Sequence, residues 1–329
     1  MINKNRLKNL VKRKIDNIFN EHDNCRQNIL LFCTRRCGST WLLEVLGSQT
    51  DAKVMGRPFH TSFDIPKYRK ILSDIKVEIN SNDPNRKITS ISGIEEKEMK
   101  NFTKLILSGD VVINPPWRFW SKRFNKYTKY VVLQMTNEKA LINWFDENFD
   151  VKIIYMLRHP IPNALSIMKR GWKTKSKKFI EDENFKDKYL NDRKIKKARK
   201  IIESGKDMEK HVLDWCLENT VPVSSDYDEK DWVVITYEQM VLEQDKTVNF
   251  LSDKLEIGDK TAMKKVYRKP SKTSSKKVES KIYDKEYLLK RWKKEVNEST
   301  INEIRKILNI FEVEEYSTSD FMPSQRLMF

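Results

Sequence analysis

The chain has 329 residues, with 64 lysines and arginines against 47 aspartates and glutamates, which gives a net charge of +17 at pH 7. This length suits one large α/β domain with insertions, and the hydrophobic fraction of 39% can fill its core. No apolar run approaches the ~20 residues that cross a bilayer as a helix, so the composition excludes a helical membrane protein.

The positive charge is spread along the chain. Its densest segment, residues 173–200, interleaves lysines with aspartates and glutamates. A basic balance of this size would allow nucleic-acid binding, but the interleaving favours a solvated surface. We therefore expect no nucleic-acid partner, and part of the charge remains available to attract an anionic small molecule.

Residues 1–27 are predicted to form an amphipathic helical segment. They are basic and lack the apolar stretch of a secretory signal. Apolar residues recur in them at helical spacing, namely Leu7, Leu10, Val11, Ile15, Ile18 and Phe19. We expect this helix to pack on the domain, with weak docking to an anionic membrane surface as the alternative. The four cysteines have no disulfide or zinc-ligand spacing, which favours a reducing, cytoplasmic location; they are Cys25, Cys33, Cys37 and Cys216.

The first motif lies in residues 28–41, where an apolar strand pattern breaks into a short loop and then opens a helix over 39–48. A loop of this kind is a typical phosphate-binding design, because the free N–H groups and the dipole of the helix start attract an anion. Gly38 lets the backbone approach the anion, and Ser39 and Thr40 add hydroxyl donors. The candidate binding residues of the loop are Arg35, Arg36, Cys37, Gly38, Ser39, Thr40 and Trp41.

The second motif lies in residues 151–172. A buried-strand pattern over 151–157 ends at Arg158, and Pro160 and Pro162 suit the first turn of a following helix. Ser166 follows Arg158 by eight positions. A guanidinium at a strand end offers a forked donor to a phosphate, and a serine on the adjoining helix can add a hydroxyl.

The other predicted elements alternate between strands and helices. We expect strands at 111–114, 130–135 and 232–237, and helices at 138–148, 161–169 and 238–255, with Ser299 or Thr300 capping a last helix. Such alternation predicts a three-layer α/β fold of P-loop-like type, with a central parallel sheet flanked by helices. Ligands of such sheets bind beyond the carboxyl ends of the strands, where both motifs fall. Residues 61–107 and 173–225 are expected to be helical insertions that wall the substrate pocket.

Neither motif fits the common phosphate loops. The Walker pattern G-x-x-x-x-G-K-[ST] is absent, and neither Cys33 nor Cys37 is followed six positions later by the arginine of a phosphatase loop. The first motif instead resembles the 5′-phosphosulfate loop of sulfotransferases that use 3′-phosphoadenosine 5′-phosphosulfate (PAPS), in the run Arg36-Cys37-Gly38-Ser39-Thr40-Trp41. The second resembles the 3′-phosphate motif of the same family, in Arg158, His159, Pro160 and Ser166.

This resemblance implies that residues 28–329 form a single sulfotransferase domain, and it implies roles for the motif residues. Arg36 would be catalytic, bridging the 5′-phosphate and the sulfuryl group, while the rest of the loop holds the 5′-phosphate and Trp41 stacks on adenine. Arg158 and Ser166 would bind the 3′-phosphate. Tyr237, in a Tyr-Glu pair at a strand end, would lie near the adenine or be a packed core tyrosine. The basic stretch 268–293 lies where relatives close a loop over the nucleotide.

The general base departs from the pattern of the cytosolic members of this family. In those members a histidine follows a Lys-Thr pair after a middle strand, and the comparable stretch 132–136 lacks it. The segment 56–60, Gly-Arg-Pro-Phe-His, resembles the bacterial trehalose sulfotransferase and places His60 where a glutamate acts as base. We predict His60 as the general base; a histidine that caps a turn is the alternative.

The expected activity is transfer of a sulfuryl group from PAPS to a hydroxyl or amine of a small-molecule or carbohydrate acceptor, such as a secondary metabolite, with release of 3′,5′-adenosine bisphosphate (PAP) and without a metal. Two alternatives are a nucleotide-dependent small-molecule kinase and a non-catalytic, basic protein that binds nucleotides or nucleic acid. The kinase would need a Walker lysine and a magnesium-binding carboxylate, and the sequence supplies neither at the expected place.

Overall fold

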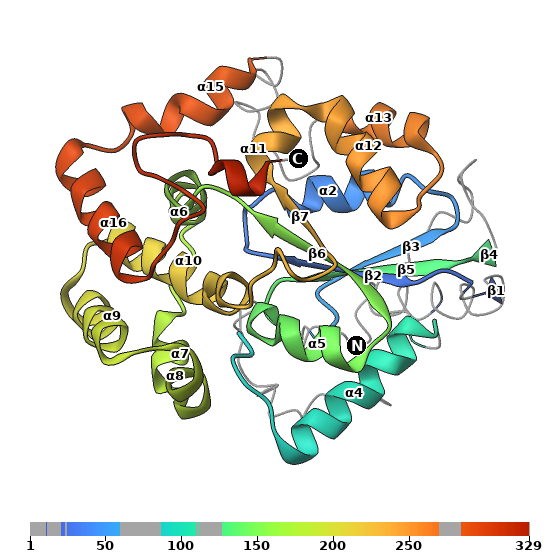
Figure 1. The fold of residues 1–329 in the computed structure, drawn as a ribbon, viewed down its shortest axis with the longest axis horizontal. Helices are drawn as coiled ribbons and strands as arrows, with labels where there is room; N and C mark the ends of the chain where they lie inside the picture. Colours follow the sequence, from blue (N-terminus) through green and yellow to red (C-terminus); the bar gives the residue numbers. More distant parts are fainter. Residues whose placement is uncertain are drawn as a thin grey trace.

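A five-stranded, entirely parallel sheet forms the centre of the molecule (Figure 1). In spatial order the strands are β3 (Ala52–Gly56), β5 (Tyr130–Met135), β2 (Asn28–Cys33), β6 (Val151–Leu157) and β7 (Trp232–Thr236). The structure, a computed structural model, describes residues 11, 21–23, 25–59, 87–109, 111, 127–269 and 284–328. The predicted α/β class with a central parallel sheet is confirmed.

The central strand β2 shows why the sheet forms. Its residues are almost continuously apolar, as expected of a parallel strand covered on both faces. Leu30 and Phe32 point into the cluster on one face, whereas Leu31 and Cys33 point into the cluster on the other. All four side chains are fully buried.

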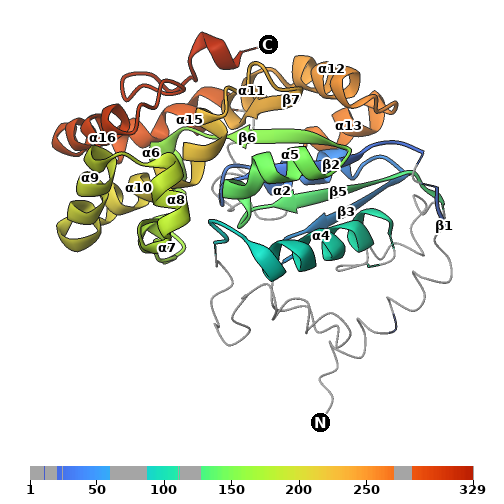
Figure 2. The same ribbon diagram turned by 60° about the horizontal axis from the view of Figure 1, so that its bottom comes forward.

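Helices cover both faces (Figures 1 and 2). One face carries α4 (Gly93–Leu107), α5 (Ile142–Asn148) and α10 (Asp207–Ser224), whose apolar residues share a core cluster with Leu30 and Phe32. The other face carries α2 (Ser39–Leu46), α12 (Gln244–Leu255), α13 (Lys260–Tyr267) and α15 (Lys285–Lys290). These two helical layers and the sheet make up the three layers of the fold.

The remaining elements are short or peripheral. Around α10 lie α6 (Pro160–Met168), α7 (Ser176–Glu181), α8 (Glu183–Tyr189), α9 (Asp192–Ser204), α16 (Glu298–Ile310) and the 3-10 turn η1 (Lys139–Leu141). The others are α11 (Tyr237–Leu242), the two-residue strands β1 (Glu21–His22) and β4 (Tyr127–Thr128), and the turns η2 (Arg291–Lys294) and η3 (Gln325–Leu327).

Several expected boundaries change. The sequence analysis missed β3, a sheet-edge strand in which buried and half-buried residues alternate. Of the expected strand at 111–114, only Val111 lies among the described residues. The helix expected over 238–255 divides at Glu243 into α11 and α12. The predicted cap of the last helix was wrong: α16 begins at Glu298, and Asn297 caps it by accepting the N–H of Thr300 at 2.9 Å.

The order of the strands places a topological switch point between β2 and β6. After β2 the chain fills one side of the sheet with β3 and β5, and it then crosses to the other side with β6 and β7. The connections that follow β2 and β6 therefore diverge, and ligands of open α/β sheets bind at such a switch point. Both sequence motifs emerge here, one after β2 and one after β6.

His159 secures the loop after β6. Its Nδ1 accepts the N–H of Ile161 at 3.2 Å and so caps α6, while its Nε2 lies 3.1 Å from the carbonyl oxygens of Ser317 and Asp320. This pattern requires a neutral ring that carries its hydrogen on Nε2. Burial lowers the pKa of His159 to about 4, although the two carbonyls oppose that shift.

The β2–α2 turn depends on Gly38. We expect Gly38→Ala to destabilise the protein, because Gly38 has a φ of +100° and an added Cβ would lie 2.6 Å from Cδ2 of Tyr237. A side chain forced into such a conformation costs on the order of 1–3 kcal/mol, measurable by urea denaturation. Gly171→Ala separates backbone strain from steric clash, because Gly171 also has a positive φ but open space around it. Gly258→Ala serves as control, because that site has neither a positive φ nor a close neighbour. Equal stability of Gly38→Ala and the control would contradict this account.

The low pKa of His159 predicts acid sensitivity. The unfolded chain takes up a proton below pH ~6.5 but the folded protein resists it until about pH 4. Stability is therefore complete above pH ~6.5 and is lost as the pH falls toward 4, by at most roughly 3 kcal/mol. His159→Asn should be less stable at pH 7 yet lose less stability between pH 7 and 5 in urea titrations. An equally steep loss in the variant would refute this role.

Candidate functional site

Arg158 joins the two motifs at the switch point of the sheet. Its guanidinium donates a hydrogen bond to the backbone oxygen of Arg36 at 2.7 Å and lies 4.2 Å from the centroid of the Tyr237 ring. The Nε of Arg36 in turn donates to Oγ of Ser166 at 3.1 Å. The structure therefore brings together four of the predicted residues from three separate strand ends.

The two guanidinium groups form a cationic cluster. Burial lowers the pKa of Arg36, and the charges of Arg170 and Arg158 lower it further, so these groups repel one another. Within the described part of the chain, no carboxylate forms an ion pair with Arg36 or Arg158, and Nε of Arg158 is buried without a hydrogen-bond partner. The cluster therefore has donors and positive charge to offer to an anion.

The neighbouring carboxylate of Glu238 does not neutralise this cluster. Its oxygens accept the backbone N–H of His159 at 3.0 Å and the hydroxyl of Tyr316 at 2.9 Å. Burial raises the pKa of Glu238, although the nearby Arg158 opposes that shift. Glu238 thus holds the polypeptide around the site without a hydrogen bond to Arg158, whose Nε keeps an unused donor.

The loop after β2 presents further donors. α2 begins at Ser39 with no acidic residue in its first turn and no side-chain cap. Among the described residues the backbone N–H groups of Gly38 and Thr40 have no backbone acceptor, whereas the N–H of Ser39 is directed to the thiol of Cys37. Gln134 donates to Oγ of Ser39 at 2.7 Å, and the Ser39 side chain also lies against the thiol of Cys37, whose pKa it lowers. Gln134 could not be identified from the sequence, because a single amide on a strand inside the sheet belongs to no recognisable motif.

Two other loop residues point into the protein. Trp41 is 8% exposed and packs edge-on against Tyr267, with ring centroids 4.7 Å apart; its stacking on adenine stays a prediction. Cys37 is fully buried. Burial raises the pKa of its thiol, but a hydrogen bond from Cys33 and the charge of Lys139 outweigh this and bring the pKa down to about 7.

Arg35 takes a different direction from Arg36. Its backbone oxygen accepts from the amide of Asn163 at 2.9 Å, and its guanidinium lies 5.4 Å from the Trp172 ring. The structure shows no contact between this guanidinium and the Arg36–Arg158 cluster. Its charge lowers the pKa of His211, after the larger effect of burial. The sequence analysis gave His211 no role, because its position on α10 becomes informative only in three dimensions.

Some of the other predicted site residues lie outside the described residues. His60 does, as do residues 270–283 of the basic stretch. The segment that leads to His60 starts beside the site, since the backbone N–H of Arg57 donates to the oxygen of Gln134 at 2.9 Å. At the end of the basic stretch Trp292 is 1% exposed, and its ring centroid lies 4.9 Å from that of His159.

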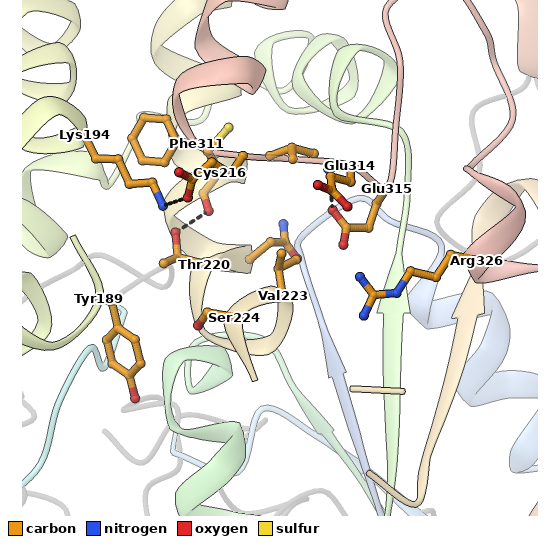
Figure 3. A pocket seen from close by; sticks show the side chains of 13 residues that line it. Tyr189, Lys194, Cys216, Thr220, Val223, Ser224, Phe311, Glu314, Glu315 and Arg326 are labelled. Atoms are coloured by element: carbon orange, nitrogen blue, oxygen red, sulfur yellow. Dashed lines mark hydrogen bonds and ion pairs between the residues drawn. The ribbon is translucent and has the colours of Figure 1, made fainter. Parts of the chain in front are cut away.

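A cavity of about 230 Å³ lies elsewhere, between α9, α10 and the segment after α16 (Figure 3). Its lining includes Lys194, Cys216, Glu315 and Arg326 and none of the predicted site residues. Glu315 there accepts a hydrogen bond from Tyr227 at 3.2 Å, and Lys194 pairs with Glu312 at 2.6 Å. The polar groups of this cavity therefore satisfy one another, unlike those at the switch point.

The described residues contain neither a membrane-spanning helix nor a cluster of metal ligands. None of the helices there combines the length and the apolar character needed to cross a membrane. The same residues contain no group of three or more His, Cys, Asp or Glu side chains that could hold a metal ion.

Comparison with known proteins gave matches in structure only. No known family model and no curated protein matches the sequence. The structure is similar to the sulfotransferase domain of the curacin biosynthetic pathway, with a TM-score of 0.46 and 14% identity over 87% of this chain and 98% of that one. It is also similar to the sulfotransferase domain of the Synechococcus PCC 7002 olefin synthase (TM-score 0.41, 10% identity, 88% and 96% covered) and to mouse sulfotransferase SULT7A1 complexed with PAP (0.38, 13%, 92% and 88%). Similarities of this size do not identify a reaction, so the functional assignment depends on the site itself.

Proposed function

We propose that this protein is a PAPS-dependent sulfotransferase that moves a sulfuryl group to a hydroxyl or amine of a small-molecule or carbohydrate acceptor and releases PAP. One observation carries the proposal. Arg158 and Arg36, 122 residues apart in the chain, meet at the switch point of a parallel sheet without a carboxylate to neutralise them. A ligand with two separate phosphate groups matches the two sets of donors, one in the loop after β2 and one in the loop after β6.

The residues present fit the nucleotide. The open N–H groups at the start of α2, with the hydroxyls of Ser39 and Thr40, would hold the 5′-phosphate. Arg158 and Ser166 would hold the 3′-phosphate, because a guanidinium with unused donors binds a phosphate dianion through charge-assisted hydrogen bonds. Tyr237 lies against the guanidinium of Arg158, which supports our proposal that it would contact the adenosine between the two phosphates.

Arg36 would assist the transfer itself. Bound PAPS supplies an activated sulfuryl group: the acceptor oxygen or nitrogen forms a bond to sulfur while the bond from sulfur to the 5′-phosphate oxygen breaks, and the acceptor proton passes to a base. By analogy with phosphoryl transfer, this chemistry needs positioning and charge stabilisation above all. Arg36 lies in the loop that would hold the 5′-phosphate, and its Nε donates to Ser166 at 3.1 Å. With its guanidinium turned toward the leaving phosphate, it would stabilise the developing charge.

His60 remains our proposed base. Its support is its sequence position, four residues after Gly56 at the carboxyl end of β3, and the backbone bond between Arg57 and Gln134 that anchors this segment beside Ser39. An imidazole titrates near neutrality and can accept the acceptor proton there.

The nucleotide site is tested by calorimetric titration with PAP, AMP and ATP. We expect PAP to bind far more tightly than AMP or ATP. Arg158→Ala should weaken PAP binding by roughly 10- to 100-fold, because charge-assisted hydrogen bonds contribute about 1.5–3 kcal/mol, and should leave AMP binding nearly unchanged. Arg158→Lys should fall between, and the exposed Arg199→Gln on α9 is the control. Equal affinity for PAP and AMP in the wild type would refute the proposal.

The role of His60 is tested by turnover with PAPS and the best acceptor from a panel of alcohols, sugars and amines. We expect His60→Ala to lower kcat by about 100-fold or more, within the range for general-base catalysis, with PAP affinity unchanged. Wild-type activity should fall below pH ~6.5 as the imidazole becomes protonated. Nearly full turnover of the variant at every pH would exclude His60 as the base.

A further inference from the structure

The side chain of Arg35 is buried without a partner. The residue is 7% exposed, and all three nitrogens of its guanidinium are buried and lack a hydrogen-bond partner among the described residues. A buried charge in this state is costly, and proteins normally provide it with a counter-charge and hydrogen-bond acceptors. An arginine held in this way is therefore a site prepared for an anion.

The surroundings of Arg35 strengthen this conclusion. Nδ1 of His211 is also buried without a hydrogen-bond partner in the described part of the chain. Lys175 lies close enough for the charge of Arg35 to lower its pKa, after the larger effect of burial. The indole of Trp172 supplies an apolar wall next to the guanidinium. Two unsatisfied polar side chains and a second cation thus converge beside an aromatic ring.

Two carboxylates act on this group: Asp207, whose charge raises the pKa of His211 against the larger effect of burial, and Asp214, which is already engaged. Asp214 accepts the backbone N–H of Lys175 at 2.9 and 2.8 Å and the hydroxyl of Ser176. Burial and the nearby Glu218 raise its pKa to about 6. The charge of Arg35 acts on Asp214 and opposes this rise in pKa, but no hydrogen bond joins them, because all three guanidinium nitrogens of Arg35 lack a partner among the described residues. These donors are left for a ligand.

The location separates this group from the nucleotide site. His211 lies on α10, which covers one face of the sheet, whereas Tyr237 packs with the cluster on the opposite face. Because consecutive Cα atoms lie only about 3.8 Å apart, Arg35 adjoins Arg36 and the transfer position while its side chain points away from the Arg36–Arg158 cluster. A ligand of Arg35 would then be a neighbour of the sulfuryl group.

From these contacts, and resting on the proposed function, we infer that Arg35, Trp172 and His211 form the acceptor subsite and that the acceptor carries an anionic group. A carboxylate or a phosphate ester would take the forked donors of Arg35 and a hydrogen bond from His211, and its carbon skeleton would lie against Trp172. The hydroxyl or amine that receives the sulfuryl group would be a few bonds away in the same molecule, next to Arg36.

The test uses the full chain saturated with PAP, so that the nucleotide site is filled, and 3-fluorobenzoate as the probe, followed by fluorine NMR. We expect 3-fluorobenzoate to bind at least tenfold more tightly than the neutral 3-fluorobenzamide. Arg35→Gln should abolish that difference and leave the Kd for PAP within twofold, Arg35→Lys should keep part of it, and Arg199→Gln should keep it in full. Phenyl phosphate, titrated in parallel, shows whether a phosphate ester is preferred to a carboxylate.

Three results would overturn the inference: equal binding of the acid and the amide to the wild type, retention of the preference in Arg35→Gln, or a tenfold loss of PAP affinity in Arg35→Gln with unchanged melting temperature. The last would assign Arg35 to the nucleotide. Failure of the wild type to bind PAP would instead refute the proposed function, and the same titration without PAP would still report on Arg35.

Discussion

The hydrogen bond from Arg158 to the backbone oxygen of Arg36 is the interaction on which the site depends. It ties the loop after β6 to the loop after β2. It also holds the guanidinium of Arg158 through Nη1 while Nε remains without a hydrogen-bond partner among the described residues. The side chain of Arg36 adds a second link between the loops by donating to Oγ of Ser166. The loops after β2 and β6, which diverge at the switch point of the sheet, are thereby joined into one surface. In the part of the chain that the structure describes, the positive charge of this surface has no carboxylate partner.

A buried polar layer supports this surface from below. Lys87 pairs with Glu218 at 2.9 Å and donates to the backbone oxygen of Thr136 at 2.6 Å. Lys139 donates to Thr34 at 3.0 Å and also to Asn219. Burial lowers the pKa of Lys139 to about 8. These bonds brace the ends of β2 and β5 against α10, and a network of this kind tolerates little movement because each lost bond would leave a buried group unsatisfied.

The sequence predicted the parts of this architecture that have a strong local signal. The bounds of β2, β5 and β6 were correct, because buried parallel strands read as continuous apolar runs. The half-exposed edge strand β3 gave no such run, and only its place in the sheet reveals it. The spacing of Arg158 and Ser166 predicted that both bind the same phosphate. The different contacts of the Arg35 and Arg36 side chains could not be predicted, because the two residues are identical and adjacent in the sequence. The contact between Trp292 and His159 joins distant positions, which periodicity cannot detect.

The support of the loop after β6 comes from far along the chain. His159 binds the carbonyl of Ser317, 158 residues later, and Gln239, which completes the capping box of α11, donates to the oxygen of Leu327 at 2.9 Å. During synthesis, which proceeds from the N-terminus at about 5–20 residues per second, the sheet strands emerge well before these partners. The strands can thus pair before the loop after β6 is held in place, and His159 gains its bonds to the carbonyls of Ser317 and Asp320 only after those residues have been made.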